Sequence, residues 1–540
     1  MRILFVQPPD IHREGFDLAT ARRRRYLNYP PYGLGLLARA AEEDGHESLI
    51  VNLQNEVLKA ALTPGQAFSF DEAWKRAIPL WGPDLICLTC MFSQTHKSLQ
   101  AVSEYIATIY PKVKQIAGGV HVTNSLTQPE TQLKFKRDLP YITDFVLYEA
   151  DESFREYLKG QPASSRPTAK AMNRPPAWHL MDPRETSRWG KVGAFYCLRD
   201  DDPICATVLS NRGCRAHCTF CSVRNFNGEG VRRRSVDSVV DELLMLQNDY
   251  GVQHVMWLDD DFLFDRHETM RLFNEMVRRG WRGTWDCSNG VIAASCTEEL
   301  LSGAASSGCI GLILGMESGN ASILKQIRKP GTVRHFIKAA ENLRQFPTIH
   351  ARVFLMIGFP QETLGQMKDT FNVAREMDLD WYNIAPLQAL PNTPIYRAAN
   401  PTEFTDIRFN SGPHSRIARR KEGTRELLSL DFSHAFDDPE RVPSLQELDA
   451  VWAYMNYHLN YDRLHREARP VKLRMQQRYV EHICDAIAPD NAFAMHFSRV
   501  LSEKLGQKVT TKQNSRLNRL LHSDPYWQAR FEEFNLLEAA

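Results

Sequence analysis

The stretch of this sequence that is most informative about fold and function is Ser210-Asn211-Arg212-Gly213-Cys214-Arg215-Ala216-His217-Cys218-Thr219-Phe220-Cys221. Its three cysteines follow the spacing Cys-x3-Cys-x2-Cys, which lets a single loop offer three thiolates to a [4Fe-4S] cluster. The next cysteine along the chain is Cys287, so the fourth iron has no nearby ligand, unlike the irons of a ferredoxin. The pattern therefore favours chemistry at an open iron over electron storage.

A structural zinc site is the alternative for the same residues, with His217 as the fourth ligand. Zinc sites usually combine two Cys/His pairs, each separated by a short knuckle. His217 is directly adjacent to Cys218, which makes it difficult for both side chains to reach one metal ion. The spacing therefore favours the iron–sulfur interpretation.

The stretch resembles the cluster loop of the radical S-adenosylmethionine (SAM) enzymes, including the aromatic Phe220 before the last cysteine. The resemblance implies that Cys214, Cys218 and Cys221 bind the cluster and that Phe220 lies beside the bound cofactor. It also implies that the open iron chelates the amino and carboxylate groups of SAM. One electron then cleaves SAM to a 5′-deoxyadenosyl radical.

Length, charge and cysteine content limit the function classes. A chain of 540 residues predicts about three or four domains. The 66 basic and 65 acidic residues nearly cancel, so no overall charge attracts nucleic acid or an anionic membrane. The amino-terminal apolar segment is too short for a signal peptide, and no stretch is suited to span a membrane. Eleven scattered cysteines do not form a disulfide framework, so we expect a cytoplasmic protein.

Residues 1–155 alternate short apolar segments with helical patterns, which predicts a doubly wound parallel sheet. The expected strands are 2–7, 48–51, 85–89 and 113–119, and the expected helices include 32–41 and 98–109. Ligands of such sheets bind outside the carboxyl ends of the strands. This rule places Thr89 and the pair Gly118-Gly119 at the binding edge.

The order of these elements resembles the cobalamin-binding domain that precedes many radical SAM cores. The resemblance rests on Pro30-Pro31-Tyr32-Gly33-Leu34 at the start of the first long helix and on Gly118-Gly119-Val120-His121-Val122-Thr123 near the end of the domain. In that family the nucleotide tail of cobalamin passes such a glycine turn, where the backbone can lie close to the ligand. The resemblance thus implies that Thr89, Gly118 and Gly119 contact cobalamin.

The segment Asp10-Ile11-His12-Arg13-Glu14-Gly15 fits the Asp-x-His-x-x-Gly pattern that supplies a histidine to cobalt in other cobalamin proteins. In that case His12 binds cobalt and Asp10 accepts a hydrogen bond from its ring. The helix that should follow at once is expected only near residue 32, so a solvated loop histidine is the alternative. The intervening run Arg22-Arg23-Arg24-Arg25 is interpreted as surface charge, with a phosphate-bearing ligand as the other possibility.

A second repeating α/β unit follows a proline-rich and polar segment, 156–205, which is interpreted as a linker. The expected strands of this unit are 206–210, 254–258, 284–287, 310–315, 351–357 and 381–385, with helices between them. Six strands with intervening helices predict a partial (β/α)6 barrel over residues 206–400. Such barrels hold their chemistry at the carboxyl ends of the strands, and the cluster residues follow the first strand directly.

Polar residues at the ends of these strands extend the resemblance to radical SAM enzymes. Asp259 and Asp260, after the second strand, are expected to bind the amino group of SAM, because a carboxylate suits an ammonium. Glu317 and Ser318, after the fourth strand, resemble the segment that contacts the ribose and the amino-acid end of SAM. Gly358, after the fifth strand, belongs to a loop that resembles the one packing on adenine.

Residues 401–540 predict a mainly helical C-terminal domain without a recognisable motif. Leu448, Trp452, Met455 and Leu459 recur at helical spacing, which is typical of a core face rather than a cofactor site. The family resemblance covers roughly residues 1–400. In related enzymes such an extension closes the mouth of the active site or shapes the substrate pocket.

Together these features predict an α/β enzyme that uses a [4Fe-4S] cluster, SAM and cobalamin, acting as a methyltransferase on an unactivated carbon. Three alternatives stay open: a cyclase or rearrangement enzyme without methyl transfer, a radical SAM enzyme that lacks cobalamin, and a cobalamin-binding regulatory module with an inactive barrel. The expected partners are a small-molecule or natural-product-like substrate and a reducing electron donor such as flavodoxin or ferredoxin. Nucleic acid is not expected as a partner.

Overall fold

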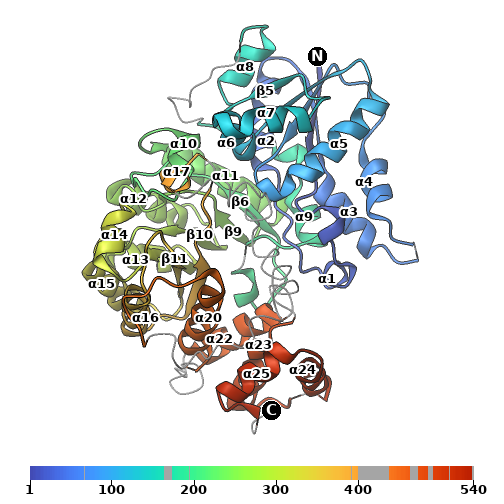
Figure 1. The fold of residues 1–540 in the computed structure, drawn as a ribbon. Coiled ribbons are helices and arrows are strands. Elements are labelled where there is room, and N and C mark those ends of the chain that lie inside the picture. The colour runs from blue at the N-terminus through green and yellow to red at the C-terminus, as the bar shows by residue number, and fades with distance from the viewer. Residues whose placement is uncertain are drawn as a thin grey trace.

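Two parallel sheets organise the chain. The computed structural model describes residues 1–65, 67–162, 173–193, 195–390, 392–398, 437–462, 472–484, 490–509 and 511–537. The first sheet belongs to the blue and cyan elements of Figure 1, the second to the green and yellow ones, and the C-terminal helices gather at the bottom of the view. Within the described residues, no helix is long and apolar enough to cross a membrane.

The N-terminal sheet has five parallel strands in the order β2-β1-β3-β4-β5. The strands are β1 (Arg2–Gln7), β2 (Glu47–Asn52), β3 (Leu85–Thr89), β4 (Lys114–Gly118) and β5 (Asp144–Val146). The helices are α1 (Leu18–Arg22), α2 (Tyr32–Glu43), α3 (Leu53–Leu62), α4 (Phe70–Ala77), α5 (His96–Ile109), α6 (Val120–Leu126), α7 (Pro129–Asp138) and α8 (Ser153–Leu158). The predicted doubly wound sheet is confirmed.

Both faces of this sheet are covered by helices. Successive residues of a strand point to opposite faces, so each face needs its own core. Ile3 and Phe5 pack with residues of α2 and α8, whereas Leu4 and Val6 pack with residues of α3, α4, α5 and α6. All four side chains are fully buried. Burial on both faces explains why β1 is an unbroken apolar segment instead of an alternating one.

The loop after β1 differs from its predicted form. Helix α1 begins at Leu18, where the side chain of Asp17 caps it by accepting a hydrogen bond from the backbone N–H of Thr20 at 2.7 Å. Arg24, from the arginine run, donates to the backbone carbonyl of Ser187 and to Asp202, both at 2.6 Å. Arg24 therefore ties the N-terminal domain to the segment that follows it, while its side chain stays 34 % exposed at the surface.

The segment interpreted as a linker is folded where the structure describes it. It contains α9 (Pro183–Trp189) and short 3-10 turns at Trp178–Leu180 and Tyr196–Leu198. The side chains of Trp178 and Phe195 are buried. A flexible linker would leave its residues solvated. This segment instead packs as part of the protein core, and the boundaries given above for the domains stay predictions.

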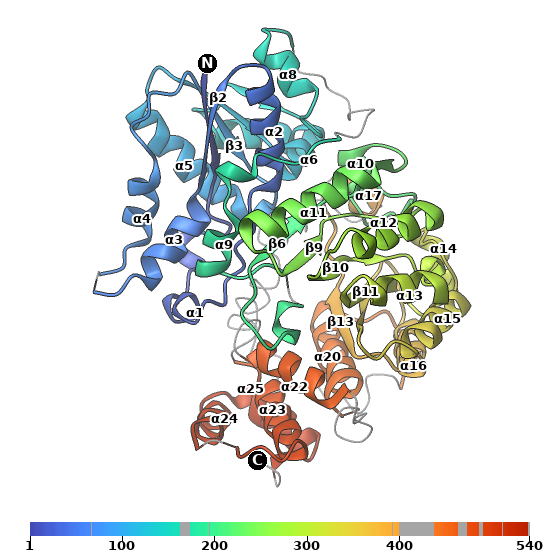
Figure 2. The same cartoon turned by 180° about the vertical axis from the view of Figure 1, so that it is seen from behind.

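The second sheet has six parallel strands in chain order, β6-β9-β10-β11-β12-β13. The strands are β6 (Cys205–Val208), β9 (His254–Trp257), β10 (Thr284–Val291), β11 (Cys309–Glu317), β12 (His350–Ile357) and β13 (Trp381–Pro386). The main helices between them are α11 (Val236–Tyr250), α12 (Arg266–Arg278), α13 (Glu298–Ser306), α14 (Ala321–Gln326), α15 (Val333–Arg344) and α16 (Leu364–Met377). Since β6 and β13 form the two edges, the barrel is partial, as predicted (Figure 2).

The amino-terminal ends of the strands form the base of this barrel, and aromatic side chains fill it. Phe195 packs so closely against Gly311 of β11 that a Cβ at position 311 would collide with its ring. The guanidinium carbon of Arg352, on β12, lies 3.7 Å from the ring centre of Phe195 and 3.8 Å from that of Tyr479. A buried arginine between two aromatic faces gains cation–π attraction on both sides. The base of the barrel is therefore closed.

The C-terminal helices are α20 (Leu445–Asn456), α22 (Leu473–His482), α23 (Ala492–Lys504), α24 (Thr511–Ser523) and α25 (Pro525–Glu533), with a π-helical turn at Tyr457–Asp462. Lys472, before α22, pairs at 2.5 Å with Asp380, which directly precedes β13. Trp452 of α20 donates to the backbone carbonyl of Ile384 in β13 at 2.9 Å. The described helices thus cover the base and the β13 edge of the barrel, and Leu448 of α20 also packs against Gly358 at the carboxyl end of β12. Residues 399–436 lie outside the described residues.

Candidate active site

A two-stranded hairpin holds the cluster loop. Strands β7 (Asn211–Arg212) and β8 (Arg232–Arg233) pair antiparallel, and the loop between them carries the three cysteines and α10 (Val223–Asn227). The loop begins at Gly213, whose φ is 89° and where a Cβ would collide with the carbonyl oxygen of Gly230. Because the hairpin follows β6, the loop lies at the carboxyl end of the barrel, where parallel barrels hold their chemistry.

The three cysteines line one cavity of about 290 Å³. The other lining residues are Ala216, Phe220, Val223, Arg224, Asp260, Asn289, Gly290, Val291, Ile292, Gly315, Glu317, Lys329, Pro330 and Phe354. They come from the cluster loop, the carboxyl ends of several strands and the segment after α14. Three thiols from one loop that face one cavity are the donor set for three irons of a [4Fe-4S] cluster. The residues present therefore fit such a cluster.

The protonation of the three thiols depends on their burial. Burial raises the pKa of Cys214 to about 11 and that of Cys221 to about 12, and it also raises the pKa of Cys218. Without iron the thiols are therefore neutral near physiological pH. Iron must displace their protons to bind, because only a thiolate is a metal ligand.

His217 does not join the cysteines in the geometry expected for zinc. Its ring is exposed, and its Nε2 lies 3.0 Å from Nη1 of Arg224. In the part of the chain that the structure describes, no three His, Cys, Asp or Glu side chains are grouped as ligands of one metal ion. The zinc alternative thus has no support from geometry.

The two adjacent aspartates after β9 have different surroundings. Asp260 lines the cavity, accepts a hydrogen bond from the amide of Asn227 at 2.8 Å, and has a pKa that burial raises to about 6. Asp259 is fully buried and accepts from the backbone N–H groups of Ser210 at 2.9 Å and Asn211 at 2.8 Å. Asp260 therefore faces the cavity, while Asp259 fixes the start of the hairpin instead of lining it.

Glu317 and Lys329 form a buried ion pair in the cavity wall. Glu317 Oε1 lies 2.9 Å from Lys329 Nζ, and the two side chains are 9 % and 10 % exposed. Glu317 has a φ of 68°, a left-handed conformation that a residue with a side chain adopts only where its surroundings impose it. Burial opposes the charge of Lys329, but the negative charges of Glu317 and of the thiolate form of Cys218 outweigh burial and raise its pKa. Lys329 Nζ also lies 5.9 Å from the ring centre of Phe220, which lines the same cavity.

Ser318 and Gly358 do not line this cavity. Ser318 is fully buried, with its Oγ 3.1 Å from Oγ1 of Thr370. Gly358 has a φ of 82°, and its backbone N–H donates to Glu362 at 2.7 Å, so that carboxylate caps the turn. The predicted contacts of Ser318 and Gly358 with SAM stay predictions.

Two of the predicted cobalamin contacts are neighbours across two strands. Thr89 and Gly118 are paired in register at the carboxyl ends of β3 and β4. Gly119 follows with a φ of 111°, and a Cβ there would lie 2.5 Å from the carbonyl oxygen of Cys90. The packing of the chain itself therefore requires glycine at position 119.

Two large apolar side chains are exposed at the same edge of the sheet. Met91 and Phe92 follow β3 after the buried Cys90 and are 56 % and 46 % exposed. Exposed apolar groups at a ligand-binding edge suit a bulky ligand with a large apolar surface, such as a corrin. The residues present thus fit cobalamin at this edge.

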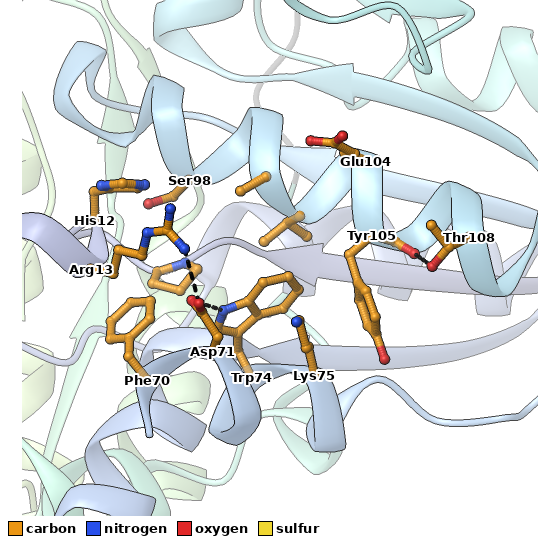
Figure 3. Close-up of a pocket in the computed structure, with 13 residues that line it drawn as sticks. His12, Arg13, Phe70, Asp71, Trp74, Lys75, Ser98, Glu104, Tyr105 and Thr108 are labelled. Carbon is orange, nitrogen blue, oxygen red and sulfur yellow. Dashed lines mark hydrogen bonds and ion pairs between the residues drawn. The ribbon is translucent and has the colours of Figure 1, made fainter. Parts of the chain in front are cut away.

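His12 lies elsewhere, in a cavity of about 330 Å³ between the loop after β1, α4 and α5 (Figure 3). The cavity is lined by Arg13, Asp71 and Trp74 among others, and by none of Thr89, Gly118 and Gly119. The structure therefore does not bring His12 together with the other predicted cobalamin contacts.

The partners of His12 also differ from the expected ones. Its Nδ1 accepts from the backbone N–H of Glu14 at 3.5 Å. Burial raises the pKa of Asp10 to about 6, and the hydrogen bond to its carboxylate comes from Gln7. The ligation of cobalt by His12 stays a prediction.

Family models match both halves of this architecture. Residues 208–374 match the Radical SAM superfamily, and residues 20–158 match the B12 binding domain. The first match contains the cluster loop and the strands up to β12, and the second contains β2 to β5. The motif resemblance and the family models thus agree on the same two domains.

Curated relatives extend over most of the chain. An uncharacterized methyltransferase of Pyrococcus horikoshii is 25 % identical over 414 residues, 74 % of this chain and 83 % of the relative. The cytidylyl-2-hydroxyethylphosphonate methyltransferase of Streptomyces wedmorensis is 25 % identical over 406 residues, 64 % of this chain and 73 % of the relative. The anaerobic magnesium-protoporphyrin IX monomethyl ester cyclase of Cereibacter sphaeroides is 23 % identical over 425 residues, 74 % and 63 % of the two chains.

Solved structures share the fold. The radical SAM methyltransferase TsrM of Kitasatospora setae, solved with cobalamin and a [4Fe-4S] cluster, matches with a TM-score of 0.61 at 16 % identity, over 98 % of this chain and 99 % of that one. OxsB, solved with aqua-cobalamin and SAM, matches with a TM-score of 0.59 at 15 % identity, over 97 % and 84 %. The two domains have a [4Fe-4S] cluster, SAM and cobalamin as their cofactors. The chain therefore contains a radical SAM domain over residues 208–374, preceded by a B12-binding domain over residues 20–158.

Proposed function

We propose that this chain is a cobalamin-dependent radical SAM methyltransferase that acts on an unactivated carbon of a small molecule. The observation that carries the proposal is the cavity in which three thiols of one loop meet the Glu317–Lys329 pair, in a chain that also has a B12-binding domain. When bound, the cluster and SAM supply a 5′-deoxyadenosyl radical and cobalamin supplies the methyl group. The protein binds and orients these groups and keeps water away from them.

Three charged residues of the cavity suit the polar ends of SAM. The ammonium of Lys329 suits the SAM carboxylate, because charge-assisted hydrogen bonds are strong in a buried site. The carboxylate of Asp260 suits the SAM ammonium, and Glu317 can accept from ribose hydroxyls while it holds Lys329 in place. We also propose that Ser318 and Gly358 contact SAM, as the family resemblance implies.

The names of the relatives support methyl transfer to small molecules. One methylates a cytidylyl-linked hydroxyethylphosphonate, and TsrM was solved with a tryptophan substrate. These two substrates share little chemistry, so they support the class of reaction rather than an individual substrate. We propose a small or natural-product-like molecule.

Anaerobic production with cobalamin, followed by cluster reconstitution, tests the proposal. We expect near-stoichiometric corrinoid and SAM-dependent formation of both 5′-deoxyadenosine and S-adenosylhomocysteine. Variants with Ala at Cys214, Cys218 or Cys221 should lose SAM cleavage while they retain corrinoid. SAM cleavage that survives in such a variant would overturn the assignment of the three cysteines.

A cyclase or rearrangement enzyme without methyl transfer is the second candidate. The observation that favours it is the likeness to the anaerobic magnesium-protoporphyrin IX monomethyl ester cyclase. Methyl transfer from SAM releases one S-adenosylhomocysteine for each methyl group, whereas cyclisation does not. Formation of 5′-deoxyadenosine with substrate present but without S-adenosylhomocysteine would select this second candidate.

We further propose that a low-potential protein such as flavodoxin or ferredoxin donates the electron, and that the protein works in the cytoplasm. All eleven cysteines are free thiols, which persist in a reducing compartment. Reduction by a purified flavodoxin system, compared with dithionite, tests the donor.

A further inference from the structure

Two buried carboxylates of the N-terminal domain hold the base of the cluster hairpin. Glu149 and Asp151 follow β5 and are each 5 % exposed. Arg212, on β7, lies 3.0 Å from Glu149 and also pairs with Asp151. Arg232, opposite it on β8, donates to Glu149 at 2.6 Å. These four residues, called the interdomain clamp below, join the N-terminal domain to both ends of the cluster loop.

The interdomain clamp continues into the cavity through two hydrogen bonds. Arg232 donates to the backbone carbonyl of Asn227 at 2.6 Å, and the side-chain amide of Asn227 donates to Asp260 at 2.8 Å. Asn227 ends α10, the helix that begins two residues after the last cluster cysteine, and α10 contacts α6 of the N-terminal domain (Figure 1). A change at Glu149 therefore reaches a lining residue of the cavity through two intervening residues.

The backbone before the clamp is also constrained. Tyr148 has a φ of 61°, and its backbone N–H donates to Oγ1 of Thr123 at 2.8 Å. Such a left-handed conformation persists in a residue with a side chain only where its surroundings fix it. Thr123 belongs to α6, which begins directly after Gly119 at the ligand edge of the N-terminal sheet. The carboxylates of the clamp are thus presented by the edge that carries the predicted cobalamin contacts.

Stability alone does not account for four charged groups at this boundary. The cost of desolvating buried charges largely offsets their attraction, so apolar residues would stabilise the contact at least as well. Ion pairs with fixed hydrogen-bond geometry do, however, select one arrangement of the two domains over others. The interdomain clamp can therefore fix the position of the N-terminal domain relative to the cluster loop.

We infer that Glu149 and Asp151 are positioning residues, by which the N-terminal domain sets the geometry of the cluster loop. The inference rests on the proposed function only in taking the three cysteines as cluster ligands. It implies that the surroundings of the cluster depend on a domain that contributes no ligand to it.

The test is the full-length double variant Glu149→Gln with Asp151→Asn, which keeps the shapes and removes both charges. After anaerobic reconstitution we expect an altered EPR spectrum of the reduced cluster. We also expect loss of the cluster in air about tenfold faster, the scale seen when outer partners of a metal site are removed. Corrinoid content should not change. An EPR spectrum and a rate of loss equal to those of the wild type would overturn the inference.

Controls separate positioning from a general loss of stability. Asp44→Asn breaks a partly buried pair within the N-terminal domain, in which Arg155 Nε lies 2.7 Å from Asp44, and should leave the cluster spectrum unchanged. Glu149→Asp keeps the charge and should restore most of the wild-type behaviour. If the double variant does not fold, Asp151→Asn alone is measured, with an intermediate rate of loss expected and a wild-type rate contradicting the inference. A wild-type protein that holds no cluster would contradict the proposed function instead.

Discussion

At the scale of single residues, Lys329 is the side chain on which the cavity depends most. It is a buried cation between a carboxylate and the cluster cysteines, and it lies in no recognised motif. The sequence predicted Glu317, because it ends a strand of the barrel. It could not predict Lys329, since only the turn of α14 brings position 329 back to the end of β11.

Replacing Lys329 by Met should raise the KM for SAM. The substitution keeps much of the volume but removes the cation and leaves Glu317 buried without its partner. A hydrogen bond to a charged group contributes about 1.5–3 kcal/mol, which corresponds to roughly a 10- to 100-fold higher KM. The measurement is the SAM dependence of 5′-deoxyadenosine formation at equal iron content. Lys325→Met, on the exposed side of α14, is the control and should be neutral, and an unchanged KM in Lys329→Met would exclude the contact with SAM.

Gly119→Ala should destabilise the N-terminal domain by about 2 kcal/mol, because the residue has a left-handed φ and its Cβ would meet the backbone of Cys90. Gly33→Ala is the matched control. Position 33 lies in α2 with no atom near its would-be Cβ, so alanine there should be neutral or stabilising. Urea unfolding of both variants measures the difference. Equal stability of the two variants would show that the loop at Gly119 can move.

The sequence does not predict which of the two adjacent carboxylates, Asp259 or Asp260, faces the cavity. The segment Asp259-Asp260-Asp261 ends a predicted strand, so a carboxylate at the mouth of the barrel could be expected. Which carboxylate faces the cavity depends on the direction of the side chains where the strand ends, and a run of identical residues does not reveal it.

At the scale of secondary-structure elements, the free edge of β13 is covered by a side chain. Asn460, in the π-helical turn, accepts from the backbone N–H of Tyr382 and donates to its carbonyl, both at 2.8 Å. Asn460 is fully buried. Its amide thus takes the place of a neighbouring strand, which an edge otherwise needs.

Asn460→Ala should cost about 3 kcal/mol of stability, because it removes both hydrogen bonds from a buried backbone segment. Asn460→Asp keeps the size and one acceptor but sets a buried carboxylate against the carbonyl oxygen of Tyr382, so near neutral pH we expect a loss of stability at least as large as for alanine. Thermal unfolding of the two variants gives the comparison. A melting temperature of Asn460→Ala within error of the wild type would mean that water replaces the amide.

The six strands of the barrel could be predicted from their apolar segments, but the length of β10 could not. The sequence indicated a strand at 284–287, and β10 continues to Val291. Its second half contains Ser288-Asn289-Gly290, residues with low strand propensity, and the register with β11 shifts between Cys287 and Val291. Such an irregularity depends on pairing with β11, which no local pattern encodes.

At the scale of the whole molecule, two buried histidines make the fold sensitive to acid. Burial lowers the pKa of His121, in the N-terminal domain, and of His482, beside the base of the barrel, from 6.5 to about 3. Below pH 6.5 the unfolded chain therefore binds protons that the folded chain does not accept until about pH 3. The contribution of these two histidines to stability is therefore full above pH 6.5 and falls as the pH decreases, whereas buried carboxylates with a raised pKa, such as Asp10 and Asp260, contribute in the opposite direction.

Each histidine contributes a slope of up to about 1.4 kcal/mol per pH unit to the free energy of unfolding over that range. Urea unfolding at several pH values measures it. His121→Gln removes one titrating group and should flatten the curve, whereas His267→Gln should not, because the side chain of His267 is 90 % exposed. Curves of equal slope for the wild type and His121→Gln would show that His121 is not buried in its neutral form.

The contacts between domains are the part of the molecule that sequence patterns predict least. Glu242 of α11 accepts hydrogen bonds from Arg234 at 2.5 Å, from Trp178 at 2.9 Å and from Tyr32 of α2 at 3.3 Å. The partners are separated by up to 210 residues in the chain. Each partner lies in a segment whose local sequence pattern does not predict a contact with the other segments. Only the assembled structure shows that they share one buried carboxylate.

The filled base of the barrel limits the routes by which substrates enter and products leave. Because the rings of Phe195 and Tyr479 lie against Arg352 at that end, molecules cannot thread through the barrel from one side to the other. Entry and exit are therefore limited to the carboxyl side of the barrel and to the gap between its edge strands β6 and β13. A product that dissociates slowly would delay binding of the next substrate, so the rate of product release can limit turnover.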